Sequence, residues 1–149
     1  EYVYAHLQPF PNEEAIFGKQ QIYNENDEVV GKVENLLINA TNISFDEVYD
    51  LVEKYGGVMI PAHVGKNSNS LMANLGFIPP DAKFTTAEVK DLKKLHELRK
   101  QHPYLEKCRI ISDSDAHYLE HMNEPMHELY VEERTREAVI KALKDSPTV

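Results

Sequence analysis

The chain has 149 residues, a net charge of −9 and a sequence pI near 5.2. This length suits one domain with a core, so we expect residues 1–149 to form a single domain. Sequence-independent DNA or RNA binding needs a Lys/Arg-rich face, so the acidic balance argues against bulk nucleic-acid binding. No signal peptide or long apolar run is visible, which predicts no membrane association. The single cysteine, Cys108, fits a reducing, cytoplasmic compartment, and we expect it to be a packed thiol.

The N-terminal part mixes strand-like and helical patterns. Residues 1–7 alternate aromatic, β-branched and polar types, which predicts a strand. Residues 12–23 have a helical pattern that begins at Asn12, a plausible N-cap. Residues 24–31 are polar and acidic and predict a turn or loop. The apolar centre of residues 35–39 fits either a helix or a strand.

A clear helix start follows at Ser44, because Glu47 stands three residues later at capping-box spacing. Gly56 and Gly57 supply a left-handed stop for this helix. The next apolar run, residues 58–63, reads as a strand that ends on His63. A helix before such a strand is typical of βαβ units and of a parallel sheet.

The middle and C-terminal parts continue with alternating elements. Residues 65–81 form a long connection, which either lines a substrate mouth or crosses the surface. Residues 84–89 fit a strand or the first turn of a helix. The remaining expected elements are a helix over 91–102, a short strand over 126–131 and an amphipathic helix over 135–144.

The stretch 109–117 carries the strongest chemical signal. Ile110 and Ile111 predict a short buried strand, and small and acidic residues follow it up to His117. In an extended segment, Asp115 and His117 would project to the same side, where a carboxylate and an imidazole could bind a transition metal. In one alternative, Asp113 and Asp115 cap a following helix that leaves His117 exposed. In another, His117 and His121 share one helix face and bind a metal together.

Two motifs, Ile60-Pro61-Ala62-His63 and Ser114-Asp115-Ala116-His117, lie about fifty residues apart, with Leu75-Gly76-Phe77-Ile78-Pro79 between them. In this order they closely resemble the later part of the polymerase and histidinol phosphatase (PHP) domain family. The resemblance covers most of the chain. It implies an α/β fold that is part of a distorted (β/α) barrel, with parallel strands and flanking helices. It also implies hydrolysis of phosphomonoesters or diesters by a metal-bound hydroxide.

The resemblance also implies a set of site residues. His63 matches the histidine of the third family motif, and Asp115 and His117 match the Asp and His of the last one. A further metal-ligating histidine is expected near the N-terminal strand, where His6 is the nearest candidate and Tyr4 the alternative. Lys66 stands where related proteins often carry a basic residue, so we expect it to bind substrate. The implied cofactors are divalent zinc, manganese or iron ions, and the implied partner is a small phosphorylated substrate.

The sequence departs from the family in one respect. The family's first motif is His-x-His, and this chain contains none and starts at Glu1. We therefore expect the C-terminal portion of a PHP-like barrel, without the N-terminal strands and motifs and inactive by itself. The alternative is a non-catalytic, metal-degenerate module that binds a partner. Sheet edges left unpaired in a partial barrel would favour a homodimer, with Leu36–Ile38 near the contact.

Overall fold

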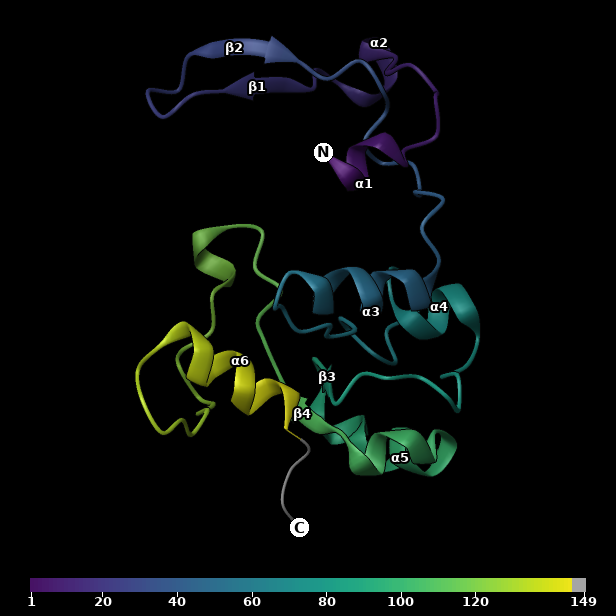
Figure 1. Cartoon of the computed structure of the whole chain (residues 1–149), viewed down its shortest axis with the longest axis vertical. Helices are drawn as coiled ribbons and strands as arrows, with labels where there is room; N and C mark the ends of the chain where they lie inside the picture. Colours follow the sequence, from purple (N-terminus) through teal and green to yellow (C-terminus); the bar gives the residue numbers. More distant parts are fainter. Residues whose placement is uncertain (146–149) are drawn as a thin grey trace. The chain divides into compact units, whose positions relative to one another are not determined.

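The computed structural model describes residues 1–145. The chain is mixed α/β and divides into two compact units, residues 1–47 and the chain from Val48 onward. The elements drawn in Figure 1 are α1 (Tyr2–Ala5), α2 (Glu14–Phe17), β1 (Gln21–Tyr23), β2 (Val29–Lys32), α3 (Phe45–Lys54), α4 (Leu71–Leu75), β3 (Thr86–Glu88), α5 (Leu95–Gln101), β4 (Arg109–Ile111) and α6 (Arg136–Lys144). Three 3₁₀ helices complete the described chain: η1 (Leu92–Lys94), η2 (Pro103–Lys107) and η3 (Leu119–His121).

The first unit is built around the antiparallel hairpin β1–β2, which pairs Gln21 with Lys32 and Tyr23 with Val29. The strand predicted over 1–7 is wrong, because Tyr2–Ala5 forms the helical turn α1. Strand pairing in this region begins only at Leu7, which bridges to Thr41. An alternating pattern becomes a strand only where a partner strand accepts its hydrogen bonds.

The helix predicted over 12–23 is also shorter than expected. Gly18 has φ +78 and ends α2, and the chain then enters β1. Gln20 donates its side-chain amide to the carbonyls of Val33 and Asn35 and accepts a hydrogen bond from Leu37 N. The undecided stretch 35–39 is neither a helix nor a continuous strand: Asn35 forms an isolated bridge with Pro11, and a turn follows at Leu37 and Ile38.

The capping box at Ser44 is confirmed. The Ser44 backbone N donates to the Glu47 carboxylate at 2.8 Å, and the Glu47 backbone N donates to Ser44 Oγ at 3.3 Å. Each end of the motif thus satisfies a backbone donor that the first helical turn leaves unpaired. Gly56, with φ +68, ends α3 as predicted.

The second unit has its core at β3. This strand is fully buried and pairs in parallel with β4 in the register Thr86–Arg109, Ala87–Ile110 and Glu88–Ile111. Figure 1 shows β3 and β4 next to each other. Residues 84–89, for which the sequence allowed a strand or a helical turn, therefore contain a strand. The short strand predicted at Ile110 and Ile111 is confirmed as β4, although it is half-buried rather than buried, and the buried thiol of Cys108 is confirmed. The least exposed core residues are Val64, Phe84, Thr86, Ala87, Val89, Leu105 and Cys108.

Two predicted strands do not form. Residues 58–63 are irregular, although Glu88 N donates to Pro61 O and Val64 N donates to Glu88 O. Pro61 has no N–H to contribute to a ladder, which limits this segment to partial pairing beside β3. Residues 126–131 are likewise irregular. Within residues 1–145 each sheet has only two strands, and no closed barrel forms.

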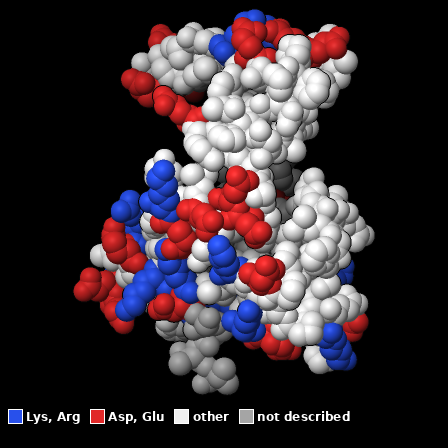
Figure 2. Space-filling view, turned by 45° about the vertical axis from the view of Figure 1, so that its right-hand side comes forward, with Lys and Arg blue, Asp and Glu red and all other residues white. Residues whose placement is uncertain are grey.

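The predicted helices of the second unit are present. The 91–102 pattern appears as η1 followed by α5, and Leu98 is its buried residue. Thr135 caps α6 by accepting a hydrogen bond from Ala138 N. Among the described helices, none is long and apolar enough to cross a membrane. On the face seen in Figure 2, basic and acidic side chains are interspersed over this unit.

Candidate functional site

The predicted ligands come from two irregular segments that lie at the carboxyl end of the β3–β4 sheet. His63 closes the irregular segment that is hydrogen-bonded to Glu88, the last residue of β3. Asp115 and His117 follow β4 after a short irregular stretch. Because β3 and β4 are parallel, their carboxyl ends lie together, so His63, held beside Glu88, can meet the segment that leaves β4.

The imidazole rings of His63 and His117 both lie near one carboxylate oxygen of Asp115. Asp115 Oδ1 lies 3.7 Å from His63 Nε2 and 3.7 Å from His117 Nε2. The prediction that these residues lie close together is therefore confirmed. The side chains of His63 and Asp115 are each 19% exposed, whereas that of His117 is 76% exposed. His117 thus reaches the cluster from the solvent side.

Two lysines face the other carboxylate oxygen of Asp115. Lys66 Nζ lies 3.0 Å from Oδ2, and Lys90 Nζ lies 3.6 Å from it. The pKa of Asp115 is lowered, first by the hydrogen bond from Lys66 and then by the electrostatic influence of the neighbouring His63, Lys66 and Lys90, while partial burial opposes the shift. Asp115 is therefore ionised at neutral pH. Sequence reasoning selected Lys66 but missed Lys90, which is brought here by the end of β3.

Glu88 is the second residue that sequence reasoning missed. One of its carboxylate oxygens, Oε2, lies 2.8 Å from His63 Nδ1 and also accepts a hydrogen bond from the His63 backbone N. Its other oxygen, Oε1, is buried and has no hydrogen-bond partner among the described residues. The sequence contained one indication of this role: Glu88 is a carboxylate between the apolar residues Ala87 and Val89. The structure buries this whole run.

Both central residues have an uncommon backbone conformation. His63 has φ +49 and Asp115 has φ +52, in the left-handed region that residues with a Cβ atom seldom adopt. Such conformations persist where surrounding contacts fix them, and they occur often at functional sites. Here the contacts are the Glu88 carboxylate on His63 N and the lysine pair on Asp115.

A small pocket adjoins the cluster and is lined by positive groups. Its volume is about 230 Å³, and Lys66, Lys90 and Lys94 line it together with His63. Val89 and Leu98 provide apolar walls. Asp91 also lines the pocket, so three lysines face one carboxylate, and the net positive charge suits an anion such as a phosphate ester. This is the local positive charge that the overall acidic composition does not supply.

His6 lies in the first unit. Its Nδ1 is 2.8 Å from the backbone oxygen of Tyr2, and its ring lies 4.2 Å from the Tyr2 ring. The other position considered there, Tyr4, is 46% exposed. Both residues belong to α1 or its C-cap rather than to the predicted strand, so the strand-end placement that motivated them is wrong.

The two alternatives for the 113–121 stretch are not supported by its conformation. No helix begins directly after Asp115, since η3 starts only at Leu119, so the helix-capping interpretation is wrong. His117 lies outside η3 and His121 inside it, so they do not share a helix face. The His121 ring instead packs edge-on against Tyr118 at 5.3 Å.

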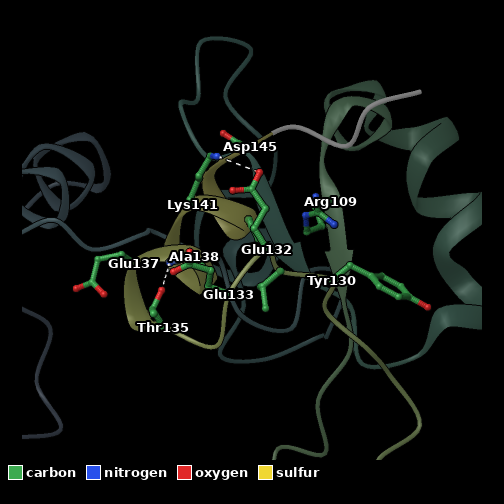
Figure 3. Close-up of a pocket in the computed structure, with 11 residues that line it drawn as sticks. Arg109, Tyr130, Glu132, Glu133, Thr135, Glu137, Ala138, Lys141 and Asp145 are labelled. Atoms are coloured by element: carbon green, nitrogen blue, oxygen red, sulfur yellow. Dashed lines mark hydrogen bonds and ion pairs between the residues drawn. The ribbon is translucent and has the colours of Figure 1, made fainter.

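A larger pocket of about 450 Å³ lies between β4 and α6, as Figure 3 shows. Arg109 and Lys141 line it together with several carboxylates, and Lys141 pairs with Glu132 at 3.5 Å. The lining contains no histidine or cysteine. Its two basic residues face four carboxylates, so the lining has a net negative charge and does not suit an anionic substrate.

Within residues 1–145, no group of three or more His, Cys, Asp or Glu side chains is arranged to hold a metal ion. Comparison of the chain with protein families, curated proteins and solved structures finds no match. The candidate site is therefore described by its own geometry. That geometry is an ionised carboxylate with two imidazole nitrogens near one oxygen and two ammonium groups near the other.

Proposed function

We propose that this chain carries part of a metal-dependent phosphoesterase site of the PHP type, within part of a distorted (β/α) barrel. In this proposal, His63, Asp115 and His117 bind one divalent ion, and Lys66 pairs with the phosphate of a small substrate. The observation that carries the proposal is the position of Asp115 Oδ1, 3.7 Å from Nε2 of both histidines. The donor types suit zinc, manganese or iron.

The donor atoms of the three residues suit a divalent metal ion, but their arrangement is incomplete as a metal site. Metal bonds of ~2.0–2.2 Å separate two ligands on a tetrahedral ion by about 3.4 Å, close to the distances around Asp115 Oδ1. However, no three-residue metal group is complete in the described chain, and ammonium groups cover Asp115 Oδ2. We therefore expect one weakly bound ion and little or no turnover from the 149 residues by themselves.

The chain's own groups have definite tasks in this proposal. Asp115 stays ionised and supplies the negative charge that a cation requires. Lys66 and Lys90 are placed to move from the carboxylate to a phosphate oxygen, because both line the adjoining pocket. Lys94 adds a third positive charge to the same wall. Such groups stabilise the negative charge of a phosphoryl group during transfer.

The first experiment measures bound metal. The chain is loaded with Mn²⁺ or Zn²⁺, dialysed and analysed for metal content, in parallel with Asp115→Ala and His63→Ala. His96→Ala, an exposed histidine on α5, is the matched control. We expect about one ion in the parent chain and in the control and a loss in the two site variants. Equal metal content in all four proteins would refute the assignment.

The second experiment measures turnover of an aryl phosphate with added Mn²⁺. Robust activity that Asp115→Ala abolishes would show that the ligand set of this chain is sufficient. Little activity together with site-specific metal binding is the expected result.

A non-catalytic binding module is the second candidate, and one observation favours it. Lys66 and Lys90 already neutralise the Asp115 carboxylate without a metal ion. In that case the cluster connects the loop after His63 to the segment after β4, and the lysine-lined pocket binds an anion. Absence of metal from every protein, with binding of inorganic phosphate that Lys94→Met weakens, would support this candidate.

A further inference from the structure

Glu88 is buried at the end of β3 in a way that packing alone does not explain. The residue is 5% exposed, and its Oε1 has no hydrogen-bond partner among the described residues. Burying a carboxylate oxygen without a partner destabilises a fold, because the group loses its hydration. The role of Glu88 in the structure therefore depends on the contacts of its other carboxylate oxygen, Oε2.

That other oxygen holds His63 at two points. Glu88 Oε2 accepts a hydrogen bond from the His63 backbone N, and it lies 2.8 Å from His63 Nδ1. The first contact fixes the left-handed backbone at φ +49, and the second fixes the rotation of the ring. The backbone of Glu88 also bonds to Pro61 O and Val64 N on either side of His63. His63 is thus positioned by one residue of the neighbouring strand.

The contact at Nδ1 has a chemical consequence at the opposite nitrogen. A carboxylate oxygen is an acceptor, so Nδ1 must carry the proton that it donates to Glu88. In the neutral ring this leaves Nε2 with a free lone pair, and Nε2 faces Asp115 Oδ1 at 3.7 Å. Two acceptors that face each other repel, and a cation placed between them removes the repulsion.

We propose that Glu88 is a positioning residue that fixes the tautomer and orientation of His63, so that Nε2 is the nitrogen that binds a metal ion with Asp115. This inference rests on the proposed function, since the cation is the proposed divalent metal. Carboxylates that accept a hydrogen bond from the other nitrogen of a metal-binding histidine orient the ring and raise its basicity. Glu88 does not itself touch the ion in this scheme.

The direct test is the tautomer of His63, read from the ¹⁵N chemical shifts of its ring in metal-free protein in mildly alkaline buffer. We expect the parent chain to carry the proton on Nδ1. Glu88→Gln keeps an oxygen that accepts both hydrogen bonds, so it should keep this tautomer. Glu88→Ala should move the proton to Nε2, where it can donate to Asp115 Oδ1. An unchanged tautomer in Glu88→Ala would overturn the inference.

The matched control is Thr86→Ala on the same buried strand. Thr86 donates to Leu143 O at 2.6 Å and has no contact with His63, so the variant loses a buried hydrogen bond at a different place. We expect it to lower thermal stability and to leave the His63 tautomer unchanged. If Thr86→Ala changed the tautomer as Glu88→Ala does, Glu88 would act only through general stability.

Metal affinity gives the second readout. We expect Glu88→Ala to weaken Mn²⁺ binding by about 10- to 100-fold, Glu88→Gln to weaken it less, and Thr86→Ala to leave it unchanged. If Glu88→Ala fails to fold, Glu88→Asp replaces it with the same expectations, because it withdraws the carboxylate by one methylene group. Absence of metal binding in the parent chain would refute the proposed function, and the tautomer measurement would still decide the role of Glu88.

Discussion

If the proposed metal ion binds at Asp115, Lys66 competes with it for the same carboxylate, which makes Lys66→Met an informative perturbation. Lys66 Nζ lies 3.0 Å from Asp115 Oδ2, and the lysine side chain is 41% exposed. Methionine keeps much of the length of the side chain and removes its charge. A divalent ion at Asp115 would then meet neither the competing hydrogen bond nor the repulsion from the ammonium group. Metal binding should therefore become tighter.

The size of the effect follows from the exposure of the lysine. Solvent screens a pair of this kind, and exposed ion pairs shift equilibria by about 1.5- to 5-fold. We expect Lys66→Met to lower the dissociation constant for Mn²⁺ by that factor, measured by calorimetric titration at low ionic strength. Added salt should reduce the difference between the two proteins. Binding of inorganic phosphate to the Mn²⁺-loaded chain should weaken, because the pocket loses one of its positive groups.

Lys94→Met is the control for charge. Lys94 lines the same pocket of about 230 Å³ and makes no ion pair with Asp115, so its removal changes net charge equally without freeing the carboxylate. Its effect on Mn²⁺ affinity should be smaller than that of Lys66→Met. Weaker Mn²⁺ binding in Lys66→Met would refute the reasoning, because it would show that Lys66 orients Asp115 rather than competing for it.

Three further predictions concern stability, reactivity and assembly. Ser44→Ala should lower the free energy of unfolding by about 1 kcal/mol in urea titration, because it removes the cap of α3, whereas Ser68→Ala in a loop should have little effect. Burial raises the pKa of the Cys108 thiol to about 11, so labelling by a mild thiol reagent at neutral pH should be slow until the chain unfolds; rapid labelling of folded protein would contradict this. If the chain forms the expected homodimer through Leu36–Ile38, Ile38→Asp should shift light scattering towards the monomer, because Ile38 is 77% exposed. A parent chain that is monomeric at high concentration would exclude this contact.

The elements that the sequence predicted well are those fixed by neighbouring residues. The capping box that begins α3, the helix expected over 135–144 and the short strand at Arg109–Ile111 are present. Each depends on residues within one or two turns of the chain, so the local pattern contains the necessary information. The choice of His63, Asp115 and His117 as neighbours was also correct, because ligand-type residues followed apolar runs.

Other features depended on contacts between distant parts of the chain. The strand predicted over 1–7 failed because strand formation needs a partner, and pairing starts only at Leu7. Residues 58–63 bond to β3 only in part, since Pro61 cannot donate. Glu88 meets His63 across 25 residues of sequence, and Lys66 meets Asp115 across 49. The sequence therefore determined which residue types were available for a site. The tertiary structure decided which of them meet: the parallel pairing of β3 with β4 places the segment after β4 beside Glu88, and the hydrogen bonds of Glu88 with Pro61 and Val64 bring His63 to the same place.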